Sequence, residues 1–220
     1  MHNKTYVAKS SSEDKKGTSW TSFAEAEMPG IIKGYEDTKY QEYDHDIAAQ
    51  TYIFNNLSDS DLPSDTNGKM NTGDRPNNLD PTLVKGIALK ETGLGTFDGS
   101  SGQNGKSDIM QANVTTDNGE TDWSNSKAAF GLEKGKSATP SQSIYAGIRI
   151  LYQKGLTTTK GVTSWTGGSD WFKAVERYNG GGTAGYTDLV KKYYNSAVKG
   201  QPSNYSPKSG LLTFLKQVSQ

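Results

Sequence analysis

The segment from Asp80 to Gly93 most constrains the fold, because it predicts a helix with defined ends and an apolar face. Asp80 is a preferred N-cap residue, and Pro81 suits the first helical position, where no N–H is needed. The apolar residues recur at helical spacing and form one face: Leu83, Val84, Ile87 and Ala88. A glycine just past the last periodic residue is a common helix stop, so we expect the helix to end at Gly93.

Glu91 continues the apolar face of this predicted helix, and it precedes a loop rich in Gly, Ser and Asn. Desolvation at a buried helix end raises the pKa of a carboxyl group, which is what a general acid near neutral pH needs. The alternative is a solvated residue in the last turn. The helix dipole disfavours an anion at this end, so the placement calls for a compensating reason.

Composition indicates a folded protein with a polar surface. Hydrophobic residues make up 32% of the 220 residues, but 12 Tyr and 4 Trp add bulk, and the 24 basic residues balance the 24 acidic ones. This neutral balance argues against nucleic acid or an anionic membrane as the main partner. The chain has no Cys, which excludes disulfides and thiolate zinc sites.

The chain ends and the domain organisation give weaker signals. Residues 1–34 are predicted to be a polar N-terminal tail or peripheral segment, with a peripheral strand as one form, and residues 35–220 a single domain. No apolar run reaches the length of a membrane span, and residues 1–17 contain no hydrophobic signal-peptide core. The protein is therefore expected to stay where it is made, to be exported by a dedicated system, or to have lost a leader.

The rest of the chain alternates polar loops with predicted helices. Residues 57–79 and 95–127 are predicted loops; the first has a faint resemblance to a calcium-binding loop, with the wrong spacing. The second contains one apolar element, Ile109-Met110-Gln111, expected to be a brief strand or a helix start. Apolar periodicity predicts helices ending near 55–56, from 140 to 155, from 169 to 178, from 186 to 198 and, more weakly, from 211 to 218.

Three short elements occur in a fixed order: Glu91-Thr92, Asp108-Ile109-Met110-Gln111 and Arg177-Tyr178-Asn179. Together they resemble the lysozyme-like superfamily, in particular the lytic transglycosylases and goose-type lysozymes, over about residues 80–198. The resemblance implies a mainly α, α+β lysozyme-like fold, with a helical domain and a small irregular or β-containing lobe that form a glycan cleft. It also implies a muramidase that cleaves the MurNAc-β-1,4-GlcNAc bond of peptidoglycan.

The same resemblance assigns roles to individual residues. Glu91 is the implied catalytic acid and then base, and no metal or organic cofactor is implied. The implied substrate-binding residues are Thr92, Asp108, Met110, Gln111, Tyr178 and Asn179. Tyr178 offers a ring for a sugar face and an OH for the catalytic carboxyl group, whereas core packing is the alternative for Met110 and Tyr178.

Asp108 departs from the family pattern, which usually has Gly at this position. Three roles stay open for it: a second catalytic carboxylate, a ligand for polar groups of the substrate, or a loop residue turned to solvent. Asp98 and Asp117 are further candidates for a second carboxylate. The spacing does not choose between hydrolysis and intramolecular transglycosylation.

The biological setting has several candidates. A wall-cleaving enzyme without a visible signal peptide is expected to be a bacteriolytic toxin injected by a secretion system, with an immunity protein as a partner, or a phage lysis or tail enzyme. A non-catalytic peptidoglycan-binding module on the same scaffold is the competing class. Peptidoglycan glycan strands are the expected ligand in each case, and a monomer is the expected state.

Overall fold

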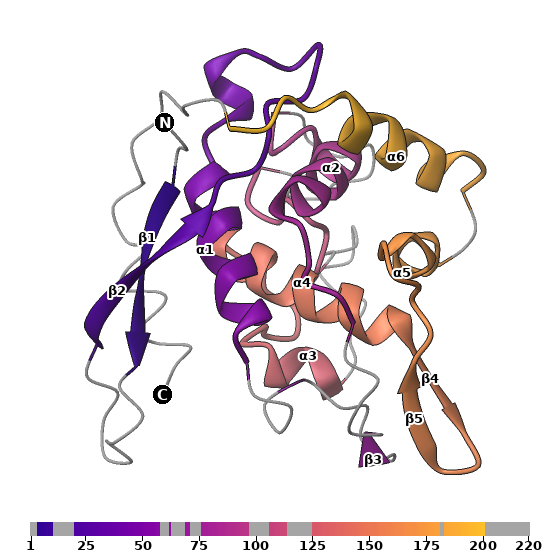
Figure 1. The fold of residues 1–220 in the computed structure, drawn as a ribbon. Helices are drawn as coiled ribbons and strands as arrows, with labels where there is room; N and C mark the ends of the chain where they lie inside the picture. Colours follow the sequence, from indigo (N-terminus) through magenta and orange to yellow (C-terminus); the bar gives the residue numbers. More distant parts are fainter. Residues whose placement is uncertain are drawn as a thin grey trace.

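The computed structural model describes residues 4–10, 20–57, 62, 69–70, 76–96, 106–113, 125–180 and 183–200. These residues form a mainly helical protein with small β elements (Figure 1). The helices are α1 (Asp44–Asn55), α2 (Pro81–Thr92), α3 (Asn125–Ala129), α4 (Pro140–Gly155), α5 (Phe172–Tyr178) and α6 (Tyr186–Ser196), with a short 3-10 turn at Thr38–Tyr40. The strands are β1 (Lys4–Ser10), β2 (Trp20–Glu27), β3 (Lys69–Met70), β4 (Leu156–Thr159) and β5 (Val162–Trp165).

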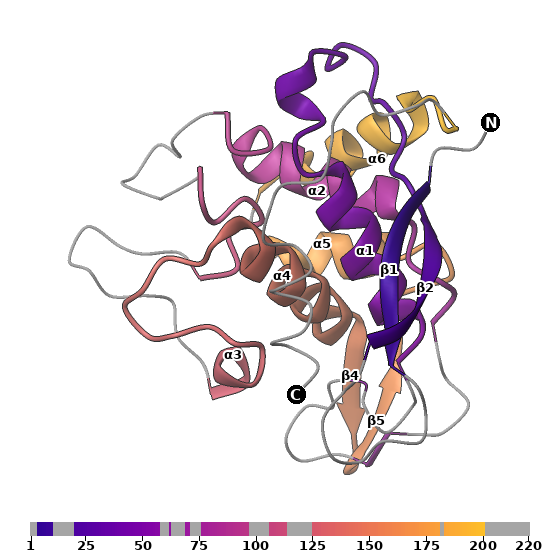
Figure 2. The same cartoon turned by 90° about the vertical axis from the view of Figure 1, so that its left-hand side faces the viewer.

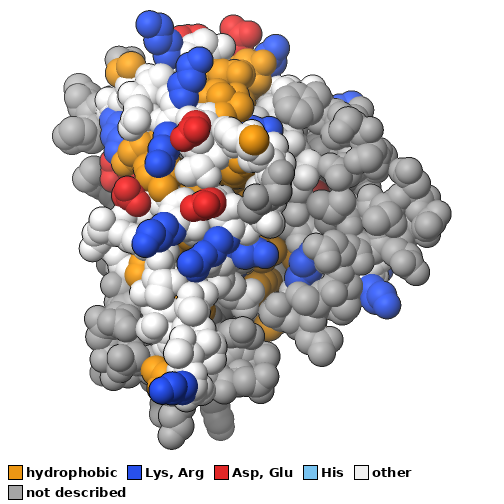
Figure 3. Space-filling model, turned by 90° about the vertical axis from the view of Figure 1, so that its right-hand side faces the viewer, with side chains coloured by type: hydrophobic (Ala, Val, Ile, Leu, Met, Phe, Trp, Pro, Cys, Tyr) orange, Lys and Arg blue, Asp and Glu red, His pale blue; other side chains and the backbone are white. Residues whose placement is uncertain are grey.

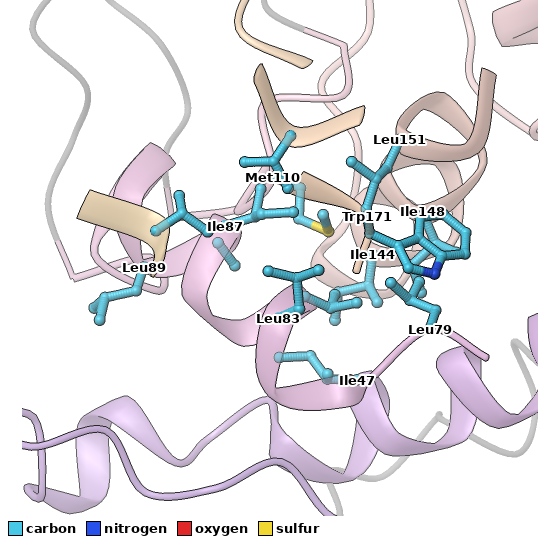
Figure 4. Packing of buried hydrophobic residues seen from close by; sticks show 14 of the residues in the cluster. Ile47, Leu79, Leu83, Ile87, Leu89, Met110, Ile144, Ile148, Leu151 and Trp171 are labelled. Carbon is cyan, nitrogen blue, oxygen red and sulfur yellow. The ribbon is translucent and has the colours of Figure 1, made fainter. Parts of the chain in front are cut away.

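The core lies between α1, α2 and α4, with α5 and α6 closing it on the side away from β1 and β2 (Figures 1 and 2). Side chains from all three central helices meet there, including Ile47, Leu83, Ile87, Ile144 and Ile148 (Figure 4). Burial of such large aliphatic side chains supplies most of the driving force for folding.

Helix α2 has the ends that the sequence predicts. The Asp80 carboxylate accepts a hydrogen bond of 2.8 Å from the Thr82 N–H, Pro81 occupies the first turn, and Gly93 adopts a left-handed φ of 60°. The helix is buried on more sides than one amphipathic face would require. Even Lys85 is fully buried, and its ammonium group pairs with Asp44 of α1 at 2.8 Å. This helix is therefore the central element of the domain.

Helix α4 begins with a capping box, in which Thr139 and Gln142 satisfy each other's backbone N–H groups. It spans the predicted range, and its apolar stripe is buried. Helix α5 is shorter than predicted, because Trp171 has a left-handed φ of 67° and the regular helix begins only at Phe172. The predicted helix at 211–218 lies outside the described residues.

Most of the strands were not predicted from the sequence. Strands β1 and β2 form an antiparallel pair beside α1, which agrees with a peripheral strand near the N-terminus. Strand β5 pairs antiparallel with β4 and parallel with the short β3. The β4–β5 hairpin follows α4 directly, and its half-buried Trp165 stacks on Tyr152 of α4.

The end of β2 and the segment that follows it are packed against other parts of the protein. Ala26 and Met28 pack on α1, Ile32 is fully buried, and Ile31 forms a β-bridge with Val198. Residues 26–32 are therefore packed against the rest of the described protein. In the described part of the chain, no helix is both long enough and apolar enough to cross a membrane.

Candidate functional site

The end of α2 is bound to the loop 106–113 through Thr92. The fully buried Thr92 hydroxyl donates to the Ile109 carbonyl at 2.8 Å and accepts from the Gly95 N–H at 3.1 Å. This brings the first two elements of the sequence motif together. Because the Thr92 side chain has no exposed surface, its position corresponds to a structural contact rather than to the substrate-binding role implied by the resemblance.

Asp108 organises the same loop from inside. Its carboxylate accepts hydrogen bonds from the Ala112 N–H (2.8 Å), the Asn113 N–H (2.7 Å) and the Ser143 hydroxyl (2.6 Å), and the residue is 4% exposed. Burial raises the pKa of Asp108, and these hydrogen bonds oppose the rise. The carboxylate is thus engaged within the protein, and the solvent-facing role that the sequence left open for it is wrong.

Met110 and Gln111 follow Asp108 but differ in placement. Met110 is fully buried and points into the core (Figure 4), where it contacts α4 at Gly147. The core-packing alternative for Met110 is therefore correct. Gln111 is partly exposed with a left-handed φ of 50°, and its side-chain amide donates to the Glu91 carbonyl at 3.2 Å. The predicted strand or helix at this element is instead a turn.

The third motif element lies at the end of α5. The Tyr178 hydroxyl donates to the Met110 carbonyl at 2.8 Å, so all three elements are joined by hydrogen bonds. Tyr178 therefore holds the loop. The sequence had suggested a bond from its hydroxyl to the Glu91 carboxyl group, but the hydroxyl bonds the Met110 carbonyl instead. Asn179 is the half-buried C-cap residue of α5, next to this contact.

The partner of the Glu91 carboxyl group is Tyr186, the first residue of α6. Its hydroxyl donates a short hydrogen bond to Glu91 Oε1, and its side chain is 4% exposed. The ammonium group of Lys90 lies 5.6 Å from the centre of the Tyr186 ring. No described residue donates a hydrogen bond to Glu91 Oε2.

The electrostatics of Glu91 match those of a general acid. Burial raises its pKa above the ordinary Glu value, the Tyr186 hydrogen bond and the charge of Lys90 oppose that rise, and the charge of Asp108 adds to it. Burial and the nearby Glu91 charge raise the pKa of both Tyr178 and Tyr186, so these two hydroxyls stay protonated. The site therefore keeps Tyr186 as a hydrogen-bond donor over the range in which Glu91 titrates.

Sequence reasoning missed Tyr186 and Ser143. Tyr186 was visible only as the start of a predicted helix, and Ser143 as one polar residue within another. Tyr186 and Glu91 are 95 residues apart, and no local sequence pattern predicts a hydrogen bond over that separation. Asp98 and Asp117 lie outside the described residues, and so do three acidic residues of the loop 57–79 on which the faint resemblance to a calcium-binding loop rests: Asp59, Asp61 and Asp65. Within the described ranges, no group of three or more acidic or His side chains is arranged to hold a metal ion.

A scan against protein-family models, a search of curated proteins and a search of solved structures each gave no significant match to this chain.

Proposed function

We propose that the protein is a muramidase, which cleaves the MurNAc-β-1,4-GlcNAc bond of peptidoglycan with Glu91 as general acid and then base. The observation that carries the proposal is the hydrogen-bonded junction around Glu91. Gln111 bonds its carbonyl, Tyr186 bonds its carboxyl group, and Tyr178 secures the loop that holds Gln111. These contacts join elements that lie far apart in the sequence but resemble the lysozyme-like motifs.

The first chemical step is protonation of the glycosidic oxygen. Because Tyr186 bonds Oε1, the acidic proton is carried on Oε2 of Glu91 and passes to the leaving oxygen as the bond to C1 of MurNAc breaks. Burial raises the pKa of Glu91, which increases the protonated fraction of this carboxyl group at a given pH, as a general acid requires. The resulting carboxylate retains the Tyr186 hydrogen bond, which stabilises its charge.

In the second step the Glu91 carboxylate removes a proton from the nucleophile that attacks C1. A water gives a hydrolysed end, and the C6 hydroxyl of the same MurNAc gives a 1,6-anhydro end without consuming water. Asp108 is an unfavourable base for the water, because Ser143 and two backbone N–H groups occupy its carboxylate. This favours the intramolecular route in the absence of another carboxylate.

The test is the release of soluble fragments from purified sacculi by the wild-type protein and by Glu91→Gln. Loss of a general acid–base group typically lowers the rate by about 10²–10⁴-fold. Glu133→Gln is the matched control, because it removes an exposed carboxylate that pairs with neighbouring Lys136. The proposal is wrong if the wild-type protein releases nothing, or if Glu91→Gln is folded and as active as the control.

Mass spectrometry of the products separates the two reaction types, since hydrated and anhydro ends differ by one water. We expect anhydro ends. Hydrated ends would show that another group activates water, while leaving the role of Glu91 intact.

A further inference from the structure

A cavity of about 470 Å³ opens beside the last turns of α4 and α5, on the face that carries α5, α6 and the β4–β5 hairpin. Its lining comprises Lys154, Lys173, Glu176, Arg177 and Gly180. Figure 3 looks onto this face and shows Lys and Arg side chains gathered in a band across it. The volume lies within the range of small-molecule pockets.

The lining is basic although the whole chain is neutral. It has three cationic side chains and one carboxylate, whereas the chain has 24 basic and 24 acidic residues. Neither Lys154 nor Lys173 forms an ion pair with any described residue, and both are exposed. Two unpaired ammonium groups facing one cavity are a ready site for an anionic group.

Hydrogen bonds hold the Arg177 side chain in place at the wall of this cavity. One guanidinium nitrogen, Nη1, donates to the Lys154 carbonyl at 3.3 Å and to the Thr166 hydroxyl at 3.2 Å. These bonds hold the planar guanidinium against the end of α4 and the residue that follows β5. The remaining N–H groups are then available in a fork that suits a carboxylate.

The cavity and the candidate catalytic site both take residues from the end of α5. Arg177 immediately precedes Tyr178, and Gly180 immediately follows Asn179. Tyr178 turns inward to the Met110 carbonyl while Arg177 turns toward Lys154, so the same helical turn serves both places. A ligand spanning both would be an extended molecule with a neutral sugar part and an anionic branch.

We propose that this cavity binds the carboxylates of the peptide stem of peptidoglycan, so that the protein prefers stem-bearing to stem-free glycan. The inference rests on the proposed function for its choice of ligand. The stem leaves the sugar chain as a branch and carries more carboxylates than amines, which matches a lining with three basic side chains and one carboxylate. Glu176 faces the amine of such a stem, and it disfavours a simple polyanion.

The test measures binding of a soluble disaccharide-peptide and of the free stem peptide by calorimetry. The Glu91→Gln protein is used, so that no cleavage occurs. We expect Lys154→Glu/Lys173→Glu to weaken binding of both ligands by roughly tenfold or more, since two attractions become repulsions. Lys134→Glu/Lys192→Glu is the control; it changes the net charge equally at exposed positions that do not line the cavity and should leave binding unchanged. Arg177 is kept, because it also supports the backbone of α4.

Equal effects of the two double variants would overturn the inference, because they would indicate long-range charge alone. The inference would also be overturned if inorganic phosphate displaced the bound disaccharide-peptide as effectively as the free stem peptide does, because the cavity would then be a phosphate site. Cleavage assays on sacculi with and without amidase treatment, which removes the stems, separate the two hypotheses. A wild-type protein that cleaves both substrates equally well refutes stem recognition and leaves the muramidase proposal standing. A protein that cleaves neither substrate but binds the stem through Lys154 and Lys173 refutes the muramidase proposal and leaves stem recognition standing.

Discussion

Gly147→Ala and Gly86→Ala make the same change in two packed helices, and we expect them to move stability in opposite directions. A methyl group at Gly147 in α4 would lie 2.7 Å from Met110 Sδ and 2.9 Å from Met110 Cβ. A methyl group at Gly86 in α2 would meet Tyr193 Cβ at 3.6 Å, an ordinary contact. Both changes carry the same intrinsic helix gain, so the difference between them measures packing alone.

The helix gain from Gly to Ala is about 1 kcal/mol. At Gly86 nothing opposes it, so the free energy of unfolding should rise by about 0.5–1 kcal/mol. At Gly147 the clash includes Met110 Cβ, which moves only with the backbone, and that backbone is bonded to Ser143 on one side and to Tyr178 on the other. Overpacking costs about 1–3 kcal/mol, and at this restrained site the upper part of that range gives a net loss of about 1–2 kcal/mol.

Thermal unfolding followed by circular dichroism tests the pair. For a chain of this size each kcal/mol moves Tm by about 2–4 °C, so we expect Gly147→Ala to lower Tm by about 2–8 °C and Gly86→Ala to raise it by about 1–4 °C. The shift of Met110 also moves Gln111, so Gly147→Ala should lose wall-cleaving activity below its Tm while Gly86→Ala keeps it. A Gly147→Ala protein as stable as Gly86→Ala would refute the close packing of the loop on α4.

Three further changes probe the site. Tyr186→Phe removes a hydrogen bond that favours ionised Glu91, so the pKa of Glu91 should rise and the alkaline limb of the pH–activity profile should move to higher pH. Glu91→Gln should raise Tm at pH 7. The pKa of Glu91 is raised in the folded state, so its carboxyl group contributes stability that is lost as the pH rises through that pKa, whereas Gln does not ionise. The increase in Tm should therefore become smaller toward pH 4 in thermal scans. Asp108→Asn leaves a buried backbone N–H without an acceptor and should lower the free energy of unfolding, measured with denaturant, by about 1–3 kcal/mol. The control is exposed Asp188→Asn in the first turn of α6, which should lower it by only a few tenths of a kcal/mol.

Helix positions were largely predictable from the sequence, because they depend on local signals. Asp80, Pro81 and Gly93 mark the ends of α2, and Thr139 with Gln142 marks the start of α4. The β4–β5 hairpin was not predicted, since its strands are short and mostly exposed and therefore lack an apolar pattern. Its place depends on Trp165 stacking on Tyr152, a tertiary contact that local periodicity does not encode.

The candidate site likewise has a part that the sequence predicted and a part that it did not. The motif elements were identified by order, and the structure brings them into hydrogen-bonded contact. Roles within them were less predictable, because residue type does not fix the direction of a side chain. Met110 turns into the core, and Tyr178 bonds a backbone carbonyl where a bond to the carboxyl group was expected. Which groups face a ligand depends on the backbone between 106 and 113, where Gln111 has a left-handed φ.

The packing of α6 on α2 supplies the reason for placing an anion at a helix end. The two helices are antiparallel: Gly86 faces Val190 and Tyr193, whereas Glu91, further along α2, meets Tyr186 at the start of α6. The helices are in contact at Gly86, and the rise along each helix then brings Glu91 and Tyr186 together at the second contact. Tyr186 thereby donates to a carboxylate that the dipole of α2 disfavours. A residue chosen for burial alone would not need this partner, so the pairing supports a Glu91 that must be both buried and able to ionise.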